Sequence, residues 1–211
     1  MVGQLISVRI VKSSMKRIIG VTGGIASGKS NICNIIKNEG YVVIDSDKIV
    51  RDLSEVGLPI YNAIKERFGQ EYLNEDLSLN KKKLAKLVFN NSAAKMVLDS
   101  ITHPIVLEEI KRQINEIKDG IIFVDVPLLY EAKFETICDK VICAFVKKKV
   151  QVERLMERDK IDEDYALAKI HSQMDLYLKR EKADYVVDTS GSFEQTQELV
   201  INLLNKIKGE Q

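Results

Sequence analysis

The sequence predicts an α/β protein in which helices cover both faces of a parallel sheet. Five short apolar runs read as buried strands, at residues 16–21, 41–44, 120–125, 141–146 and 185–188. Segments with helical spacing of apolar residues separate these runs, which is typical of right-handed parallel connections. The first run leads directly into Gly23–Ser30, which fits the phosphate-binding pattern GxxxxGK(S/T). These observations indicate a three-layer α/β/α fold with one nucleotide site.

Length and composition favour a single domain. The chain has 211 residues, enough for one sizeable core. Lys and Arg number 32 against 31 for Asp and Glu, so net charge attracts neither nucleic acid nor an anionic membrane. No apolar run approaches the roughly 20 residues needed to cross a bilayer. We therefore expect a cytoplasmic protein with no nucleic-acid or membrane partner, as a monomer or weak homo-oligomer.

Two further features limit the interpretation. The three cysteines, Cys33, Cys138 and Cys143, form no CxxC pair, which argues against a disulfide framework and a zinc site. Residues 1–15 form an extension before the first strand, and its apolar stretch is too short and broken for a signal peptide. An extra strand, a frayed tail and an upstream start codon are all compatible with it, and Met15 could be the functional start.

The phosphate-binding pattern lies between the first strand, Lys16 to Val21, and a helix expected from Gly28 to Asn38. Such a turn points backbone N–H groups into a concavity, where the helix dipole adds positive potential. Lys29 would place its ammonium between the β- and γ-phosphates, and Ser30 would complete the oxygen shell of a magnesium ion. A glycine turn with a solvated lysine is the alternative, and the agreement of strand, turn and helix signals argues against it.

Two strands end in carboxylates. Tyr41 to Ile44 delivers Asp45-Ser46-Asp47 at its carboxyl end, the edge where ligands bind in open parallel sheets. If this strand lies beside the first one, Asp47 can accept a hydroxyl proton, although these residues could also cap the next helix. Gly120 to Asp125 ends in Asp125 in the manner of a Walker B carboxylate that holds magnesium's water shell. A strand-end turn residue is an equal alternative for Asp125.

Residues 48–118 show helical spacing and few strand signals, so they predict a helical insert. Gly57-Leu58-Pro59 predicts a turn, and Asn80 predicts a helix start. Thr102-His103-Pro104 predicts a break that opens a new helix with Pro104 at its first position. His103 at this break is either an interior histidine or a substrate contact, and both interpretations stay open.

Residues 150–182 predict a lid. A helix from Gln151 to Asp159 and a second polar helix from about Asp162 to Tyr177 would return antiparallel to each other. Neither has a broad apolar stripe, so we expect a protruding, mobile hairpin.

Arg154 and Arg158 share one face of the first lid helix. As bidentate donors they would neutralise transition-state charge on the γ-phosphate. Surface pairing with Glu153, Glu157 or Asp159 is the alternative.

The end of the chain predicts a last strand at 185–188 and a helix opened by a capping box of Ser192 and Gln195. Val200, Leu203, Leu204 and Ile207 would pack this helix on the sheet. The expected core therefore comprises residues 16–47, 119–149 and 183–211.

The ordered set of motifs resembles the dephospho-coenzyme A kinase family from Met15 to about Gly209. The residues that carry the resemblance are Ile19–Ile25 with Ser27–Ser30, Asp45–Asp47 with Arg51, His103-Pro104, Asp125–Glu131, Gln151, Arg154, Arg158, Asp159, Gln173, Lys179 and Ala183–Asp188. The first motif occurs in many nucleotide enzymes, whereas the ordered set is far more selective.

The resemblance implies transfer of the γ-phosphoryl group of ATP to the ribose 3′-hydroxyl of dephospho-coenzyme A, the last step of coenzyme A synthesis. It implies five parallel strands of a P-loop fold, a helical substrate-binding insert and a lid. ATP would contact Gly24, Ala26, Ser27, Gly28, Lys29, Ser30, Asn31 and Thr189; the acceptor would contact Asp47, Arg51, His103 and Leu128; Ser30 and Asp125 would hold Mg²⁺; Lys29, Asp47, Arg154 and Arg158 would be catalytic.

Four positions depart from the family pattern. Ala26 replaces the usual middle glycine of the loop, Asn31 a common threonine, Thr189 a typical asparagine and Asp175 a usual proline. Because alanine is the smallest substituent, we expect the loop to form.

Rival functions remain to be separated. A nucleoside monophosphate kinase of the same fold would differ in its acceptor. A GTPase switch would need an NKxD segment, and Asn80-Lys81 and Asn205-Lys206 lack the aspartate two residues on. A non-catalytic nucleotide-binding module would keep Lys29 but would not need Asp47 aimed at the loop.

Overall fold

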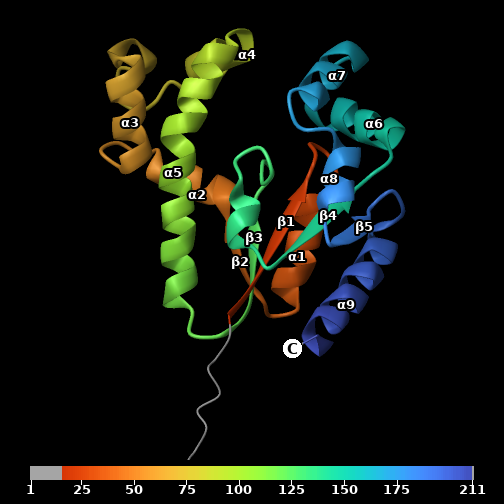
Figure 1. Ribbon diagram of the computed structural model, residues 1–211. Helices are drawn as coiled ribbons and strands as arrows, with labels where there is room; N and C mark the ends of the chain where they lie inside the picture. The colour runs from red at the N-terminus through yellow and green to blue at the C-terminus, as the bar shows by residue number, and fades with distance from the viewer. Residues whose placement is uncertain (1–15, 211) are drawn as a thin grey trace, which may run out of the picture.

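The computed structural model describes residues 16–210, so the expected N-terminal extension and the possible start at Met15 lie outside the described residues. Five strands form one sheet with helices on both sides (Figure 1). The strands are β1 (Lys16–Gly23), β2 (Val42–Asp45), β3 (Gly120–Asp125), β4 (Lys140–Phe145) and β5 (Tyr185–Asp188). All pairings are parallel. The predicted α/β class and the five predicted strands are confirmed.

The strand order is β2-β3-β1-β4-β5. The expectation that the second strand lies beside the first is wrong, because β3 lies between them. The physical reason is visible in the burial of the two strands. Five of the six residues of β3 are buried, as a central strand requires, whereas β2 has four residues and exposes Val42. The short strand therefore takes the edge.

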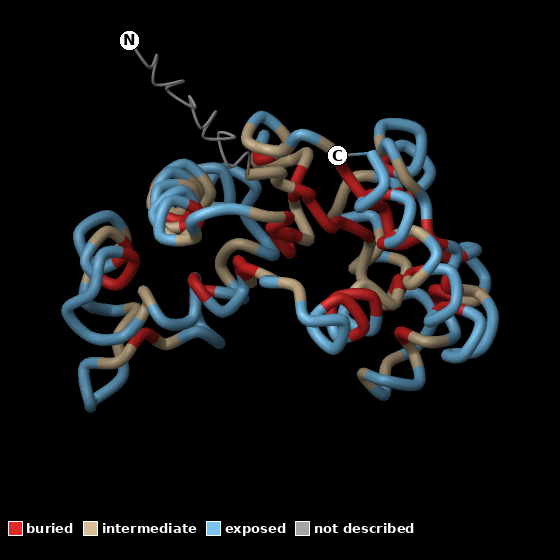
Figure 2. Tube along the Cα trace, turned by 90° about the horizontal axis from the view of Figure 1, so that it is seen from below, coloured by how far each residue is buried: buried red, intermediate tan, exposed pale blue. Residues whose placement is uncertain are grey.

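Helices α1 (Lys29–Asn38) and α9 (Phe193–Gly209) pack together on one face of the sheet. Side chains alternate along β3, so Ile121 and Phe123 join the α1 and α9 cluster while their neighbours join the opposite one. Figure 2 shows buried residues along the strands and on the inward sides of the helices. The predicted capping box of Ser192 and Gln195 opens α9.

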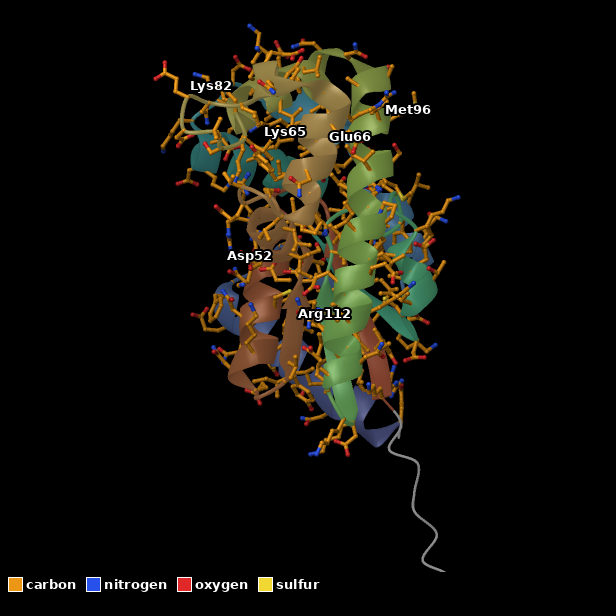
Figure 3. The ribbon with its side chains drawn as sticks, turned by 90° about the vertical axis from the view of Figure 1, so that its left-hand side faces the viewer. Asp52, Lys65, Glu66, Lys82, Met96 and Arg112 are labelled. Atoms are coloured by element: carbon orange, nitrogen blue, oxygen red, sulfur yellow. The ribbon has the colours of Figure 1, made fainter. Side chains whose placement is uncertain are left out.

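The predicted helical insert is present between β2 and β3. It contains α2 (Ser46–Leu53), α3 (Pro59–Phe68), the 3₁₀ turn η1 (Gln70–Tyr72), α4 (Lys81–Asn90) and α5 (Ser92–Glu116). Asn80 caps α4 as expected, its side chain accepting the N–H of Lys83 at 2.9 Å. The insert's outer face is solvated, and Figure 3 shows Lys65, Glu66 and Arg112 along it.

The predicted helix break at Thr102-His103-Pro104 is wrong, because α5 runs through it with Pro104 inside. Proline has no N–H, so the carbonyl of Ser100 receives no helical bond from it. Pro104 itself is exposed, while Val106 and Ile110 on the next turns are buried. Contacts of α5 with α2, α3 and α4 and with the sheet keep the helix continuous, because tertiary packing outweighs local propensity.

The lid region contains α6 (Lys148–Asp159) and α7 (Glu163–His171), joined through buried Val152, Leu155 and Ala166. The prediction of a second helix reaching Tyr177 is wrong. That helix ends at His171, residues 172–175 turn the chain, and α8 (Leu176–Lys182) follows. Asp175 causes the restart, since its side chain accepts the N–H of Tyr177 at 2.7 Å.

Helix α8 packs against β4 and β1 rather than extending the lid hairpin. Across the open side of the molecule, the ring of Phe89 on α4 lies 6.0 Å from that of Tyr165 on α7. Within residues 16–210, no helix combines the length and apolarity that a bilayer crossing requires.

Candidate active site

The predicted strand, turn and helix around the phosphate-binding pattern are confirmed. Strand β1 ends at Gly23, Gly28 is the N-cap of α1, and Lys29 is the first helical residue. Gly28 has φ 79°, and a Cβ there would lie 3.0 to 3.2 Å from the side chain of Thr189, so only glycine fits. The first turn of α1 has backbone N–H groups without helical partners, which gives an anion site with the positive end of the dipole.

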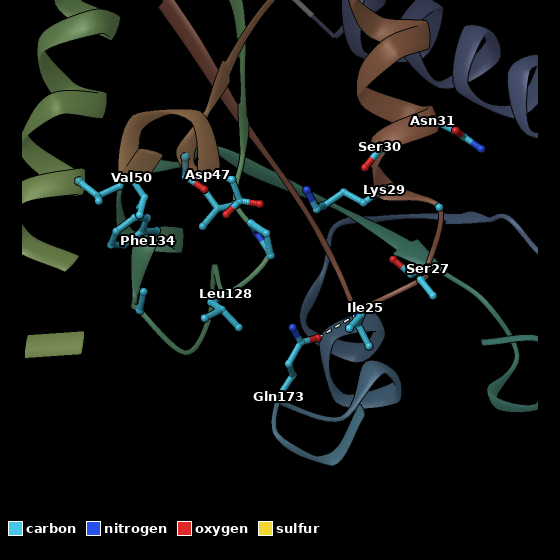
Figure 4. Close-up of a pocket in the computed structure, with 18 of the residues that line it drawn as sticks. Ile25, Ser27, Lys29, Ser30, Asn31, Asp47, Val50, Leu128, Phe134 and Gln173 are labelled. Atoms are coloured by element: carbon cyan, nitrogen blue, oxygen red, sulfur yellow. Dashed lines mark hydrogen bonds between the residues drawn. The ribbon is translucent and has the colours of Figure 1, made fainter. Parts of the chain in front are cut away.

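The loop forms with Ala26, as expected. Ala26 adopts a left-handed backbone with φ 57°, which costs a residue with a side chain roughly 1–2 kcal/mol. Its side chain packs against the α6–α7 cluster. The N–H of Asn31 donates to the carbonyl of Gly28 at 3.0 Å, and Figure 4 shows its side chain pointing away from Lys29.

Lys29 is paired with Asp125. Its ammonium donates to Oδ1 of Asp125, and the two side chains are only 12% and 10% exposed. Asp125 ends β3 and stands in register with Asp45 at the end of β2. Because β3 pairs directly with β1, this carboxylate lies beside the phosphate loop that follows β1. The strand order thus places a second acid between Lys29 and the Asp45-Ser46-Asp47 turn.

The two aspartates of the Asp45-Ser46-Asp47 turn have different roles: one caps a helix and the other faces a cavity. Asp45 caps α2, since its Oδ1 accepts the N–H of Lys48 at 2.9 Å. Asp47 follows in the first turn of α2 and is exposed to a cavity that it shares with Lys29 (Figure 4). Capping and an available carboxylate therefore coexist in this turn.

The surroundings of Asp47 raise the pKa of its carboxyl group. Desolvation by the cavity walls is the largest cause, and the nearby carboxylates of Asp45 and Asp125 act in the same direction. The positive charges of Lys29 and Arg51 oppose the shift. The group is reachable from the cavity, yet it holds its proton more firmly than a solvated aspartate.

The cavity has a volume of about 700 Å³ and lies between the phosphate loop, the insert and the lid. Its apolar wall is formed by Val50, Val106, Val126, Leu128, Ala132 and Phe134. Twelve of the fifteen predicted site residues line it: Gly24, Ala26, Ser27, Gly28, Lys29, Ser30, Asn31, Asp47, His103, Leu128, Arg154 and Arg158. The fold therefore gathers residues far apart in sequence around one space.

Three predicted site residues lie outside this lining. Asp125 sits behind Lys29. Arg51 is exposed, with Nε 3.8 Å from Asp52. Thr189 is buried behind the loop, where its hydroxyl donates to the carbonyl of Ser27 at 2.8 Å. Thr189 thus supports the loop from behind.

The two lid arginines have different partners. Nη2 of Arg154 donates to the carbonyl of Thr189 at 2.7 Å, which ties α6 to the segment behind the loop. Nε of Arg158 donates to Asp159 at 2.8 Å, so the surface pair anticipated as an alternative is present for this residue. Both guanidinium groups still border the cavity.

His103 lies on α5 at the cavity wall. Its ring contacts that of Phe134 edge-on at 6.0 Å, and Nε2 is 3.7 Å from Asp99. Partial burial lowers the pKa of His103, with Asp99 opposing the shift. The lowered pKa favours the neutral imidazole, which can donate or accept a hydrogen bond.

Several lining residues escaped the sequence-based prediction, among them Val50, Thr102, Phe134 and Gln173. The apolar residues give no local signal, because only tertiary packing brings them to the cavity. Gln173 carried a usable signal, because it is one of the residues on which the family resemblance rests. Its Oε1 accepts the N–H of Ile25 at 2.9 Å (Figure 4).

None of the three cysteines lines the cavity. Cys33 and Cys143 are buried, Cys138 is partly buried, and all three are free thiols. Burial raises the pKa of Cys143 to about 11 and that of Cys138 to about 12.

The sheet is parallel, and its phosphate loop opens onto a cavity. An acid in this cavity faces the lysine of the loop, and the lid helix brings arginines to its edge. Together these features define a P-loop phosphotransferase for a small-molecule acceptor. A family model described as dephospho-CoA kinase matches residues 17–195. The chain belongs to the dephospho-CoA kinase family.

Individual relatives support this assignment. The dephospho-CoA kinase of Carboxydothermus hydrogenoformans is 44% identical over 194 residues, covering 90% of this chain and 94% of the relative. That of Halalkalibacterium halodurans is 38% identical, covering 90% and 96%. The solved dephospho-CoA kinase of Campylobacter jejuni matches with TM-score 0.68 and 32% identity over 93% of this chain and all of that one. A shikimate kinase from Acinetobacter baumannii, with TM-score 0.54 and 17% identity, shares the fold.

Proposed function

We propose that this protein transfers the γ-phosphoryl group of ATP to the ribose 3′-hydroxyl of dephospho-coenzyme A, giving coenzyme A and ADP. Membership of the dephospho-CoA kinase family supports the acceptor. The observation that carries the mechanism is that Lys29 and Asp47 open onto one cavity of about 700 Å³. This places a phosphate-binding group and a proton acceptor within reach of the same ligand.

On the donor side, backbone N–H groups of the phosphate loop other than that of Ile25, together with the first turn of α1, would bind the phosphates of ATP. Lys29 would exchange Asp125 for the β- and γ-phosphates, since both anions compete for one ammonium. Asn31, in the first turn of α1, would also contact ATP. Thr189 would act from behind, by holding Ser27 and the lid arginine Arg154.

The residues present suit a magnesium ion held jointly with the nucleotide. Mg²⁺ takes oxygen ligands and is commonly bound by one or two protein groups plus phosphates and water. Ser30 and Asp125 offer a hydroxyl and a carboxylate beside the loop, and no larger group of metal-ligating side chains gathers within residues 16–210. When bound, the ion would neutralise charge on the β- and γ-phosphates.

On the acceptor side, Asp47 would accept the proton of the attacking hydroxyl. Its raised pKa makes it a better base than a solvated aspartate, provided that it is ionised. Arg51, His103 and Leu128 would contact dephospho-coenzyme A, with His103 neutral. Arg154 and Arg158 would offset the charge that develops on the transferred group.

We also propose a cytoplasmic protein, a monomer or weak homo-oligomer, without a nucleic-acid partner. The near balance of 32 basic and 31 acidic residues supports the last point, because no net charge draws the chain to a polyanion.

The test is transfer of labelled phosphate from ATP by the purified protein, with dephospho-coenzyme A, AMP and CMP compared as acceptors. We expect product with dephospho-coenzyme A, and loss of transfer when EDTA removes Mg²⁺, restored by excess Mg²⁺. Preference for AMP or CMP would instead indicate a nucleoside monophosphate kinase, and transfer that withstands EDTA would exclude the metal role.

A further inference from the structure

The segment of residues 172–175, which returns the chain from α7 to α8, reaches two walls of the cavity at once. Gln173 Oε1 accepts the N–H of Ile25 in the phosphate loop at 2.9 Å. The next residue, Met174, donates its N–H to Oε1 of Glu131 at 2.9 Å. Two consecutive residues therefore bind the phosphate loop and the loop after β3, respectively. We call residues 126–131 the acceptor loop, since Val126, Pro127 and Leu128 line the cavity.

A buried lysine fixes the acceptor loop. The side chain of Lys179 on α8 is 0% exposed, and its ammonium donates to Glu131 at 2.8 Å and to the carbonyl of Pro127 at 2.7 Å. The hydroxyl of Thr22 on β1 donates to the same carbonyl at 3.1 Å. A buried ammonium is costly unless it is paired and hydrogen-bonded. Both partners of Lys179 come from the acceptor loop, so the position of this loop is tied to α8.

The phosphate loop is held from a second direction. Nε2 of Gln151 on α6 donates to the carbonyl of Ile25 at 2.8 Å, so both peptide groups of Ile25 are engaged by the two ends of the α6–α7 hairpin. A Cβ on Gly24 would lie 2.7 Å from that amide nitrogen, so a larger residue at position 24 would displace the Gln151 amide from this bond. The N–H of Ile25 is thus committed to Gln173, while the start of α1 remains for phosphate.

We propose that Gln173, Glu131 and Lys179 are positioning residues for phosphoryl transfer, which hold the phosphate loop and the acceptor loop at a fixed separation through residues 172–175. This inference rests on the proposed function. The continuous path runs from Ile25 through Gln173 and Met174 to Glu131, Lys179 and Pro127. Transfer in line requires the two reactants to be held within a fraction of an ångström, whereas binding of each alone does not.

The positioning role predicts a separation of kinetic effects. Loosening the link leaves each ligand's own contacts in place, so the affinity for either ligand alone changes little. The chemical step then slows, because the hydroxyl and the γ-phosphate meet less often in line. A residue that only stabilises the fold would instead lower both affinities and the melting temperature together.

The test uses the full-length protein and three variants. Gln173→Met removes the acceptor for Ile25 at nearly constant size. The double variant Glu131→Gln with Lys179→Met removes both charges of the pair together, which avoids leaving the Glu131 carboxylate without its cation. Gln197→Met makes the same change as the first variant at an exposed position on α9 and serves as the control.

Three quantities are measured: kcat, the Kd of magnesium with a non-hydrolysable ATP analogue, and the Kd of dephospho-coenzyme A. For Gln173→Met and the double variant we expect kcat to fall at least tenfold, with each Kd within threefold of the wild type. Gln197→Met should match the wild type. Wild-type kcat in both test variants, or parallel loss of both affinities with a lower Tm, would overturn the inference.

Hydrogen exchange supplies a readout that does not depend on turnover. Amides of residues 23–28 should exchange faster in the double variant, although its substitutions lie outside the phosphate loop. Unchanged exchange there would overturn the link by itself. Failure of the wild-type protein to phosphorylate dephospho-coenzyme A would count against the proposed function, and the exchange result would still decide whether the two loops are coupled.

Discussion

Asp47 illustrates how one carboxylate is prepared by its neighbours. It stands in the first turn of α2, one residue after the helix-starting Ser46 and two after the capping Asp45. The cap keeps the turn in place, so Asp47 is free to face the cavity that contains Lys29. Desolvation and two nearby acids raise its pKa, while Lys29 and Arg51 restrain the shift.

Replacing Asp47 by asparagine tests the base. Asp47→Asn keeps the size of the side chain and removes its ability to accept a proton, so kcat should fall by roughly 10²-fold or more. Affinity for ATP should barely change, because the phosphates are bound by the loop. Steady-state kinetics and binding of an ATP analogue measure both. Asp52→Asn, an exposed change on the same helix, is the control, and near-normal turnover of Asp47→Asn would remove Asp47 from the mechanism.

The pH dependence of kcat/KM should report the raised pKa of Asp47 in the free enzyme. The base acts when ionised, so activity falls as the pH drops through this pKa, above the ordinary value of about 3.9. Asp45→Asn keeps an acceptor for the cap and removes a charge that raises the pKa, so the acidic limb should move to lower pH. Arg51→Gln should move it to higher pH, by less, because the exposed guanidinium is screened. Shifts in the same direction would contradict the assignment to Asp47.

At the scale of elements, α6 presents one polar face to the nucleotide site. Gln151 and Arg154 lie one turn apart and bind Ile25 and Thr189, respectively. The adjoining side of the helix packs on α7 through Val152 and Leu155. The helix therefore joins the lid to the phosphate loop and its supporting segment, and it brings a cation to the edge of the cavity.

Truncating Arg154 tests whether this cation acts in the transition state. Arg154→Ala should cost about 1 to 3 kcal/mol of transition-state stabilisation, or roughly 5- to 150-fold in kcat/KM, with a fall in kcat. Lys149→Ala removes an exposed cation from the same helix and should have little effect. If only the KM for ATP rises, Arg154 binds the nucleotide without assisting transfer.

Helix α5 tolerates an internal proline because its packing compensates for the missing bond. A proline in a helix interior is about 3 kcal/mol less favourable than alanine, although alanine makes the unfolded chain more flexible. Pro104→Ala should therefore raise the free energy of unfolding by about 1 to 2 kcal/mol, measured by urea denaturation. Lys111→Ala, at another exposed position of α5, serves as the comparison. A loss of stability would show that Pro104 is required by the fold.

At the scale of the whole molecule, local sequence signals predicted where the strands and several of the helices lie in the chain. They did not predict which strands lie side by side in the sheet. The apolar runs of β3 and β5 match the structure to the residue, and the loop pattern located the nucleotide site. Assuming that the second strand lies beside the first did not give the correct strand order. The order depends on which strand is buried on both faces. The continuous apolar character of β3 against the short β2 carried that information.

The site divides in the same way. Charged and glycine residues such as Lys29 and Asp47 were predicted, because their chemistry needs a particular type at a particular spacing. Apart from Leu128, the apolar wall was not predicted, because Val50 and Phe134 are apolar residues like any others in the core. Only the folding of the insert against the sheet, with α5 unbroken, selects which of them face the cavity.

The position of β1 between β3 and β4 also constrains how the chain is made. A ribosome adds roughly 5–20 residues per second, so on the order of ten seconds separate the synthesis of β1 from that of β3. During this interval neither β1 nor β2 has a strand to pair with, and Ile19 and Val21 have no sheet to join. Unpaired apolar strands invite aggregation, and α1, which contacts both β1 and β2 in the folded protein, is the early helix placed to cover them until residues 120–125 emerge.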